Sequence, residues 1–144
     1  SIGYALPAAI GAAVARPNSC VVAMGGDGGL LMSVHEMETC ARLGMKIRFF
    51  LLNNNNRLGL LENHLEHLHG LKGVLGTRNP IDWELISSAF RWNYISVSSE
   101  SEIEDAANAA FASPGPVLVD LKCDDQLSPD FKNTLSVADR ASGI

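Results

Sequence analysis

The sequence contains no long apolar run and no cluster of basic residues, and each absence excludes a class of protein. None of its 144 residues lies in an apolar segment near the roughly 20 residues that a membrane-spanning helix needs, so we expect no membrane partner. The net charge is −5, which argues against nucleic acid as a ligand because its phosphates would be repelled. With 47% hydrophobic and 19% charged residues, the composition is that of a globular domain.

Cysteine is also scarce. Cys20, Cys40 and Cys123 are odd in number and far apart, a pattern that favours free thiols over a disulfide framework or a zinc site. We therefore expect a reducing, cytoplasmic location. Because Cys20 and Cys40 adjoin apolar segments, both are predicted to lie in the core.

The chain is organised around residues 25–56. An apolar run at 21–24 leads into four glycines that surround Asp27; a helix-like segment at 33–43, a second apolar run at 47–52 and four asparagines at 53–56 follow. This order predicts a strand–helix–strand unit with parallel strands, which brings both polar loops to the carboxyl edge of one sheet.

These loops carry the groups expected of a magnesium-dependent anion site. Glycines allow the backbone to approach a ligand and direct N–H groups at an anion. Asp27 alone would repel an anion, so its presence indicates a cation between the two, and Mg²⁺ prefers carboxylate and amide oxygens. An unliganded glycine turn and asparagine loop is the alternative, since both residue types commonly form loops.

Two motifs resemble those of thiamine-diphosphate-dependent enzymes. Gly26-Asp27-Gly28, followed after residues 29–52 by Asn53-Asn54, is similar to the GDG…NN signature of that family. Residues 1–11 resemble the segment that precedes the signature in the branch of acetolactate synthases and 2-oxo-acid decarboxylases. The resemblance covers nearly the whole chain and implies thiamine diphosphate and Mg²⁺ as cofactors.

The resemblance also implies a role for individual residues. Mg²⁺ would be bound by the side chains of Asp27 and Asn54 and by the carbonyl of Asn56, with Asn53 and Asn55 as alternative ligands. The diphosphate would lie against the backbone of Gly26, Gly28 and Gly29, and Ile2 would support the bent cofactor. No catalytic side chain is assigned to this chain.

The implied function is that of the cofactor-binding domain of an acetolactate-synthase-like enzyme, which decarboxylates a small 2-oxo acid and joins the product to a second carbonyl. A 2-oxo-acid decarboxylase and a non-catalytic cofactor-binding or assembly module are the alternatives. In the family, the glutamate that activates the cofactor comes from a pyrimidine-binding domain. We therefore expect a partner domain or subunit, a homo-oligomer, and no activity of this chain alone.

The segment after residue 56 departs from the family. Carboligases usually have a Gly-Met pair and then a tryptophan here, whereas this chain has Gly59-Leu60 and no tryptophan before Trp83. Decarboxylases place a glutamate where Leu60 stands, which weakens that alternative. His64 and His67, with Glu62 or Glu66, have the spacing of a helical metal site, but contact with substrate is the more plausible role.

The predicted fold is α/β, a three-layer α/β/α sandwich with a mainly parallel sheet that lacks its first strand. We expect the domain at 1–122, as a fragment of a larger enzyme, and a surface tail at 123–144. Helices are predicted at 3–15, 33–43, 81–91 and 99–112, and strands at 21–24, 47–52, 94–97 and 117–121. The predicted helix-boundary signals are capping boxes at Ser33/Glu36 and Ser99/Glu102 and a C-terminal glycine cap at Gly44. The predicted inward residues of the third helix are Leu85, Ile86, Ala89 and Phe90.

Overall fold

The structure is a computed structural model that describes residues 2–55, 61, 65–66, 68–71 and 80–123. In this part of the chain the sheet is entirely parallel, with strand order β1-β2-β4-β3. The strands are β1 (Val21–Gly26), β2 (Ile47–Asn53), β3 (Asn93–Val97) and β4 (Val117–Lys122). All four predicted strands are confirmed, each within two residues of its predicted bounds.

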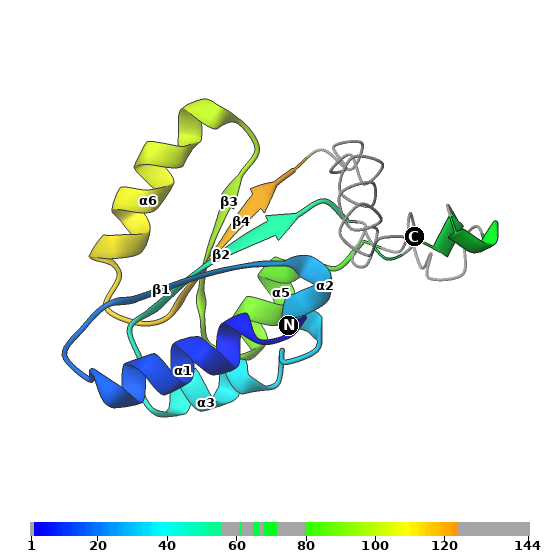
Figure 1. Ribbon diagram of the computed structural model, residues 1–144. Helices are drawn as coiled ribbons and strands as arrows, with labels where there is room; N and C mark the ends of the chain where they lie inside the picture. The colour runs from blue at the N-terminus through cyan, green and yellow to red at the C-terminus, as the bar shows by residue number, and fades with distance from the viewer. Residues whose placement is uncertain (1, 56–60, 62–64, 67, 72–79, 124–144) are drawn as a thin grey trace, which may run out of the picture.

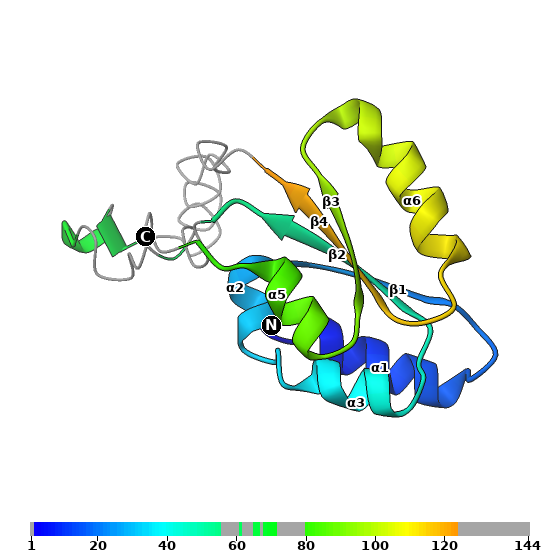
Figure 2. The same cartoon turned by 180° about the vertical axis from the view of Figure 1, so that it is seen from behind.

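Helices cover both faces of the sheet. On one face lie α1 (Ala5–Ala15), α3 (Glu36–Arg42) and α5 (Trp83–Ala89), whereas α6 (Ile103–Ala112) lies on the other, as both views show (Figures 1 and 2). The short α2 (Asp27–Leu31) leaves β1 directly, and the 3₁₀ turn η1 (Glu100–Glu102) leads into α6. The predicted α/β class and its α/β/α layering are therefore confirmed.

Alternation along the strands divides the core in two. Phe49 and Leu51 of β2 and Leu118 of β4 point to the face of α1, α3 and α5. Their neighbours Phe50 and Val119 point to the face of α6. This second face is covered unevenly: α6 packs on β3 and β4, while Val22 and Met24 of β1 remain exposed.

Two of the predicted local signals are confirmed. Both hydrogen bonds of the Ser99/Glu102 capping box are present, although the box opens η1 before α6 begins. Gly44 follows α3 with a positive φ of 61°. The Gly44 N–H donates to the Ala41 carbonyl, and the Met45 N–H donates to the Cys40 carbonyl. This is a Schellman motif, for which glycine is the favoured residue.

The predicted capping box at Ser33/Glu36 is wrong. The helix expected at 33–43 is split: α2 ends at Leu31, a turn follows, and α3 begins at Glu36. The Glu36 N–H bonds to the backbone carbonyl of Ser33, and the buried Ser33 Oγ has no hydrogen-bond partner among the described residues. The turn bonds backbone to backbone, so the serine side chain does not act as a cap.

The inward face of α5 was predicted incorrectly at Leu85 and Ala89, which are exposed. The helix begins at Trp83, not at residue 81, because the Asp82 carboxylate caps it by accepting from the Leu85 N–H at 2.9 Å. Trp83 and Ser87 then occupy the buried face, one turn apart. The expectation that Trp83 and Trp92 serve packing is confirmed, since both lie in the core.

Of the two cysteines predicted to lie in the core, only Cys40 does. Burial, assisted by the nearby Glu36 carboxylate, raises the pKa of the Cys40 thiol to about 12, so it stays protonated. Cys20 is exposed because it precedes β1 at the edge of the sheet. All three cysteines are free.

In the described part of the chain, no helix is long and apolar enough to cross a membrane.

Candidate functional site

The two predicted loops meet at the carboxyl edge of the sheet. β1 and β2 are adjacent and parallel, and the last residue of β1, Gly26, is the register partner of Leu52. Asp27 follows the first of these residues and Asn53 the second. Their juxtaposition therefore results from strand pairing and does not depend on the conformation of either loop.

Asp27 is held close to this edge. It is the first residue of α2, which begins without any connecting loop after β1, and its side chain is buried, with 3% of the residue exposed. One carboxylate oxygen, Oδ1, accepts a hydrogen bond from the Gly28 N–H at 2.9 Å. Because the preceding residue belongs to a paired strand, the carboxylate has little freedom to move away from the sheet edge.

The glycines around Asp27 serve different purposes. A Cβ on Gly25 would lie 3.1 Å from Phe49 Cζ and 3.3 Å from Ala5 Cβ, so packing inside the protein excludes a larger residue there. A Cβ on Gly26 would come no closer than 3.9 Å to any neighbour, the Leu52 carbonyl oxygen, and its φ of −77° suits any residue. Neither packing nor backbone geometry explains a glycine at 26, and its predicted contact with the diphosphate stays a prediction.

Residues from the start of the chain lie beside this loop. A Cβ on Gly29 would be 3.6 Å from the backbone nitrogen of Gly3, which places the segment before α1 against α2. Ile2, in the turn that precedes α1, is 61% exposed. A large apolar side chain therefore stands in the open near the glycine loop, although its predicted contact with a cofactor stays a prediction.

The asparagine run divides into inner and outer residues. Asn53 ends β2 with its side chain buried, Asn54 is half-buried, and Asn55 is exposed in a left-handed conformation with φ of 55°. Asparagine is among the residues that best tolerate this conformation. The Asn55 N–H donates to Asn53 Oδ1 at 3.1 Å, so the loop is bonded to the end of its own strand. Asn56 lies outside the described residues.

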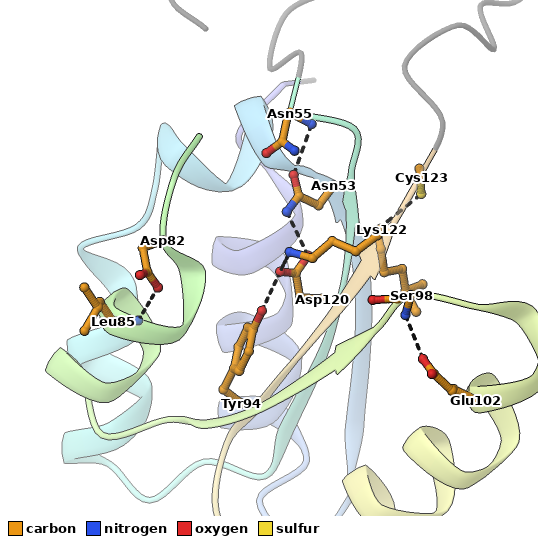
Figure 3. A network of polar contacts seen from close by, with 11 residues as sticks. Asn53, Asn55, Asp82, Leu85, Tyr94, Ser98, Glu102, Asp120, Lys122 and Cys123 are labelled. Atoms are coloured by element: carbon orange, nitrogen blue, oxygen red, sulfur yellow. Dashed lines mark hydrogen bonds and ion pairs between the residues drawn. The ribbon is translucent and has the colours of Figure 1, made fainter. Parts of the chain in front are cut away.

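A polar network lies behind this loop, and sequence reasoning missed it (Figure 3). Asp120, fully buried in β4, accepts from Asn53 Nδ2 at 2.9 Å through Oδ1. Its second oxygen, Oδ2, accepts from the Tyr94 hydroxyl at 2.7 Å and pairs with Lys122 Nζ. Burial, together with this hydrogen bond to the carboxylate, raises the pKa of Tyr94 to about 12, so the phenol stays a donor at neutral pH.

One signal in the sequence pointed to this network: Asp120 is a charged residue inside the buried run at 117–121. Its partners in sequence-distant strands could not be identified from that signal. The possible metal site at His64 and His67 lies outside the described residues. The described residues contain no group of three or more His, Cys, Asp and Glu side chains that could hold a metal ion, so a site at Asp27 would need amide or backbone oxygens as well.

Comparison with known proteins identifies the family. Residues 1–121 match the model described as thiamine pyrophosphate enzyme, C-terminal TPP binding domain. The chain belongs to this family. Thiamine pyrophosphate is thiamine diphosphate, and the predicted cofactors, thiamine diphosphate and Mg²⁺, are those of the family.

The similar sequences include acetolactate synthases. The chain is 34% identical over 127 residues to the isozyme 2 large subunit of Escherichia coli K12, and 30% identical over 134 residues to acetolactate synthase 2 of Brassica napus chloroplasts. These alignments cover 87% and 88% of the chain but only 23% and 21% of the relatives. The chain thus spans less than a quarter of the length of either relative.

A solved structure supports the same fold. The thiamine-diphosphate-dependent 4-hydroxybenzoylformate decarboxylase of Rhodococcus jostii RHA1 superposes with a TM-score of 0.76 over 85% of this chain and 23% of the decarboxylase, at 24% identity. This likeness concerns the fold. The sequence similarity to acetolactate synthases agrees with the first of the predicted functions, a thiamine-diphosphate-binding domain of the acetolactate-synthase type.

Proposed function

We propose that this chain holds the diphosphate end of thiamine diphosphate through Mg²⁺, in an enzyme that decarboxylates a small 2-oxo acid and joins the product to a second carbonyl. The observation that carries the proposal is the buried Asp27 carboxylate beside the asparagine loop at the carboxyl edge, in a chain of this family. We prefer carboligation to simple decarboxylation because the sequence similarity is to acetolactate synthases. The likeness to the decarboxylase is one of fold alone.

The residues fit the cofactor chemically. Mg²⁺ prefers hard oxygen ligands and is usually bound by one or two carboxylates together with the phosphates of its partner molecule. Asp27 supplies the carboxylate, and we assign the amide oxygen of Asn54 and the carbonyl of Asn56 as further ligands. Asn53 is the poorer alternative because its Oδ1 already accepts from Asn55 and its Nδ2 donates to Asp120.

The division of labour follows from these positions. When bound, the thiazolium ring of the cofactor supplies the carbon nucleophile and electron sink for decarboxylation. Asp27 neutralises part of the charge of Mg²⁺, and the backbone at Gly26, Gly28 and Gly29 approaches the diphosphate. Ile2, exposed beside the glycine loop, offers apolar surface to the cofactor. We assign this chain to cofactor binding and assign no catalytic side chain among its described residues.

The remaining parts of the proposal concern the surroundings of the chain. We expect a pyrimidine-binding domain, in the same polypeptide or in a partner subunit, a homo-oligomer, and no turnover by residues 1–144 alone. The exposed Val22 and Met24 side chains of β1 support a further packing partner on this face of the sheet. Three free thiols support the cytoplasmic location.

A thermal melt of the full-length protein tests the proposal. At about 100 times its dissociation constant, thiamine diphosphate with Mg²⁺ should add roughly 2.7 kcal/mol of stability. Asp27→Ala and the isosteric Asp27→Asn should lose this gain, whereas Asp105→Ala, an exposed position on α6, should keep it. Equal gains for wild type and both Asp27 variants would refute the metal site.

A further inference from the structure

A chain of hydrogen bonds with a fixed direction runs from β4 to the asparagine loop. Asp120 can only accept, so Asn53 must present its Nδ2 donor to Asp120 Oδ1 at 2.9 Å. That orientation points Asn53 Oδ1 the other way, where it accepts from the Asn55 N–H at 3.1 Å. The orientation of one carboxylate therefore determines where the loop backbone is bonded (Figure 3).

Asp120 is itself firmly oriented. Its Oδ2 is shared by the Tyr94 hydroxyl and the Lys122 ammonium, which leaves Oδ1 for Asn53. The Asp120 side chain is fully buried, and the backbone of β4 continues to bind the end of β2, since the Cys123 N–H donates to the Asn53 carbonyl at 2.9 Å. Strand pairing and side-chain bonding thus hold Asn53 at two points.

We propose that Asp120 is a positioning residue for the divalent ion: through Asn53 it fixes the backbone of the loop so that Asn54 presents its amide oxygen. Asn54 lies between Asn53 and Asn55, which this bond connects, so the backbone conformation of Asn54 depends on that bond. The inference rests on the proposed magnesium site, and it adds a residue of β4 that makes no contact with the ion.

The bond chain predicts an unusual response to a conservative change. In Asp120→Asn the new amide has one oxygen, and the Lys122 ammonium, which can only donate, retains it together with the Tyr94 hydroxyl. The amide nitrogen then faces Asn53 Nδ2, donor against donor. If Asn53 rotates to offer its oxygen, its nitrogen faces the Asn55 N–H, and the conflict moves into the loop.

A reciprocal exchange should restore the chain. In the double variant Asn53→Asp with Asp120→Asn, the amide at 120 donates to the carboxylate at 53, whose other oxygen accepts from the Asn55 N–H. Asn53→Asp alone places two carboxylates against each other and should fail. This single variant also tests whether the new carboxylate binds the ion directly. If it did, the single variant would bind Mn²⁺ as tightly as the double variant.

The measurement is the dissociation constant of Mn²⁺, a divalent ion that accepts the same oxygen ligands, read from the paramagnetic resonance signal of free Mn²⁺ with the full-length protein and thiamine diphosphate. Changes in groups that orient metal ligands typically weaken affinity 10- to 100-fold. We expect at least a tenfold increase in the dissociation constant for Asp120→Asn and for Asn53→Asp, and recovery to within about threefold of wild type in the double variant.

Trp92→Phe is the structural control. It removes a buried hydrogen bond, from Trp92 Nε1 to the Met37 carbonyl at 2.8 Å, in a part of the core away from the loop. It should lower the melting temperature while leaving the Mn²⁺ dissociation constant unchanged. A weaker affinity in Trp92→Phe equal to that in Asp120→Asn would show that general destabilisation explains the effect, and would overturn the inference.

Two further outcomes separate this inference from the proposed function. If wild type binds Mn²⁺, Asp27→Asn does not, and Asp120→Asn binds like wild type, the positioning role is wrong while the metal site stands. If wild type shows no saturable Mn²⁺ binding with thiamine diphosphate, or binding independent of Asp27, the proposed site itself fails and the inference fails with it.

Discussion

Arg48 and Asp120 are both buried charged side chains on neighbouring strands, but they bond to different segments at opposite ends of the sheet. Arg48, near the start of β2, donates to the carbonyls of Gly115 and Ser113 at 2.6 and 2.5 Å and so holds the turn before β4. Asp120, towards the end of β4, binds Asn53, which in turn binds the loop that follows β2.

The difference lies in what each network leaves available. The partners of Arg48 are carbonyls of a turn that connects α6 to β4, so its bonds complete the fold. The network of Asp120 ends at a loop whose next residues, Asn54 and Asn55, are half-buried and exposed. Ligands of open parallel sheets bind at the carboxyl edge, so the Asp120 network lies beside the proposed site, whereas the bonds of Arg48 lie at the opposite edge.

The largest expected effect is on stability at the amino edge. Arg48→Met would leave the Gly115 and Ser113 carbonyls without their charged donor, and bonds to charged groups contribute about 1.5–3 kcal/mol each. We expect a loss of about 3 kcal/mol in urea unfolding, with the gain from thiamine diphosphate and Mg²⁺ unchanged. Arg42→Met, an exposed partner of Glu38, should change stability by less than about 0.5 kcal/mol. If Arg48→Met lost the stability gain from thiamine diphosphate and Mg²⁺, the contrast between Arg48 and Asp120 would be wrong.

A medium effect is expected at Asp82, which caps α5. Replacing an N-cap aspartate with alanine typically costs about 1 kcal/mol, here by removing the bond from the Leu85 N–H. Because the Asp82 carboxylate bonds within its own helix, to the Leu85 N–H, Asp82→Ala should lower the melting temperature but leave the Mn²⁺ dissociation constant at the wild-type value. A large change in that constant would extend the loop-positioning network to α5.

The smallest effect concerns alkaline pH. The pKa of Tyr94 in the folded protein is about 12, above its ordinary value of 10, mainly because of burial and then because of its bond to Asp120. The folded state thus favours the neutral phenol. Its contribution to stability is present below about pH 10 and is lost as the pH rises towards 12.

Tyr94→Phe removes this titration. The melting temperature of the variant should therefore fall less steeply than that of wild type between pH 10 and 12, in parallel melts of the full-length protein. Parallel curves would show that the pKa of Tyr94 is the same in the folded and unfolded states, which would contradict the prediction. The ultraviolet difference spectrum of the two proteins should independently show a phenol that ionises above pH 10.

Much of the site could be predicted because its signals are local. The glycine loop after an apolar run and the asparagines after the next one require only that the two strands be parallel and adjacent, which the register of Gly26 and Leu52 confirms. Ser99 with Glu102 and the stop at Gly44 were also correct, since a cap depends on residues within one helical turn.

The tertiary structure decided what depends on distant partners. Asp120 and Asn53 are 67 positions apart, and only the order β2-β4-β3 brings the carboxylate between Asn53 and Tyr94. The split at Ser33 and the exposure of Leu85 have the same origin, because a backbone turn and the burial of Trp83 override local capping and periodicity. The sequence by itself determined which groups reach the carboxyl edge; strand order and packing determined which of them turn inward to support the loop.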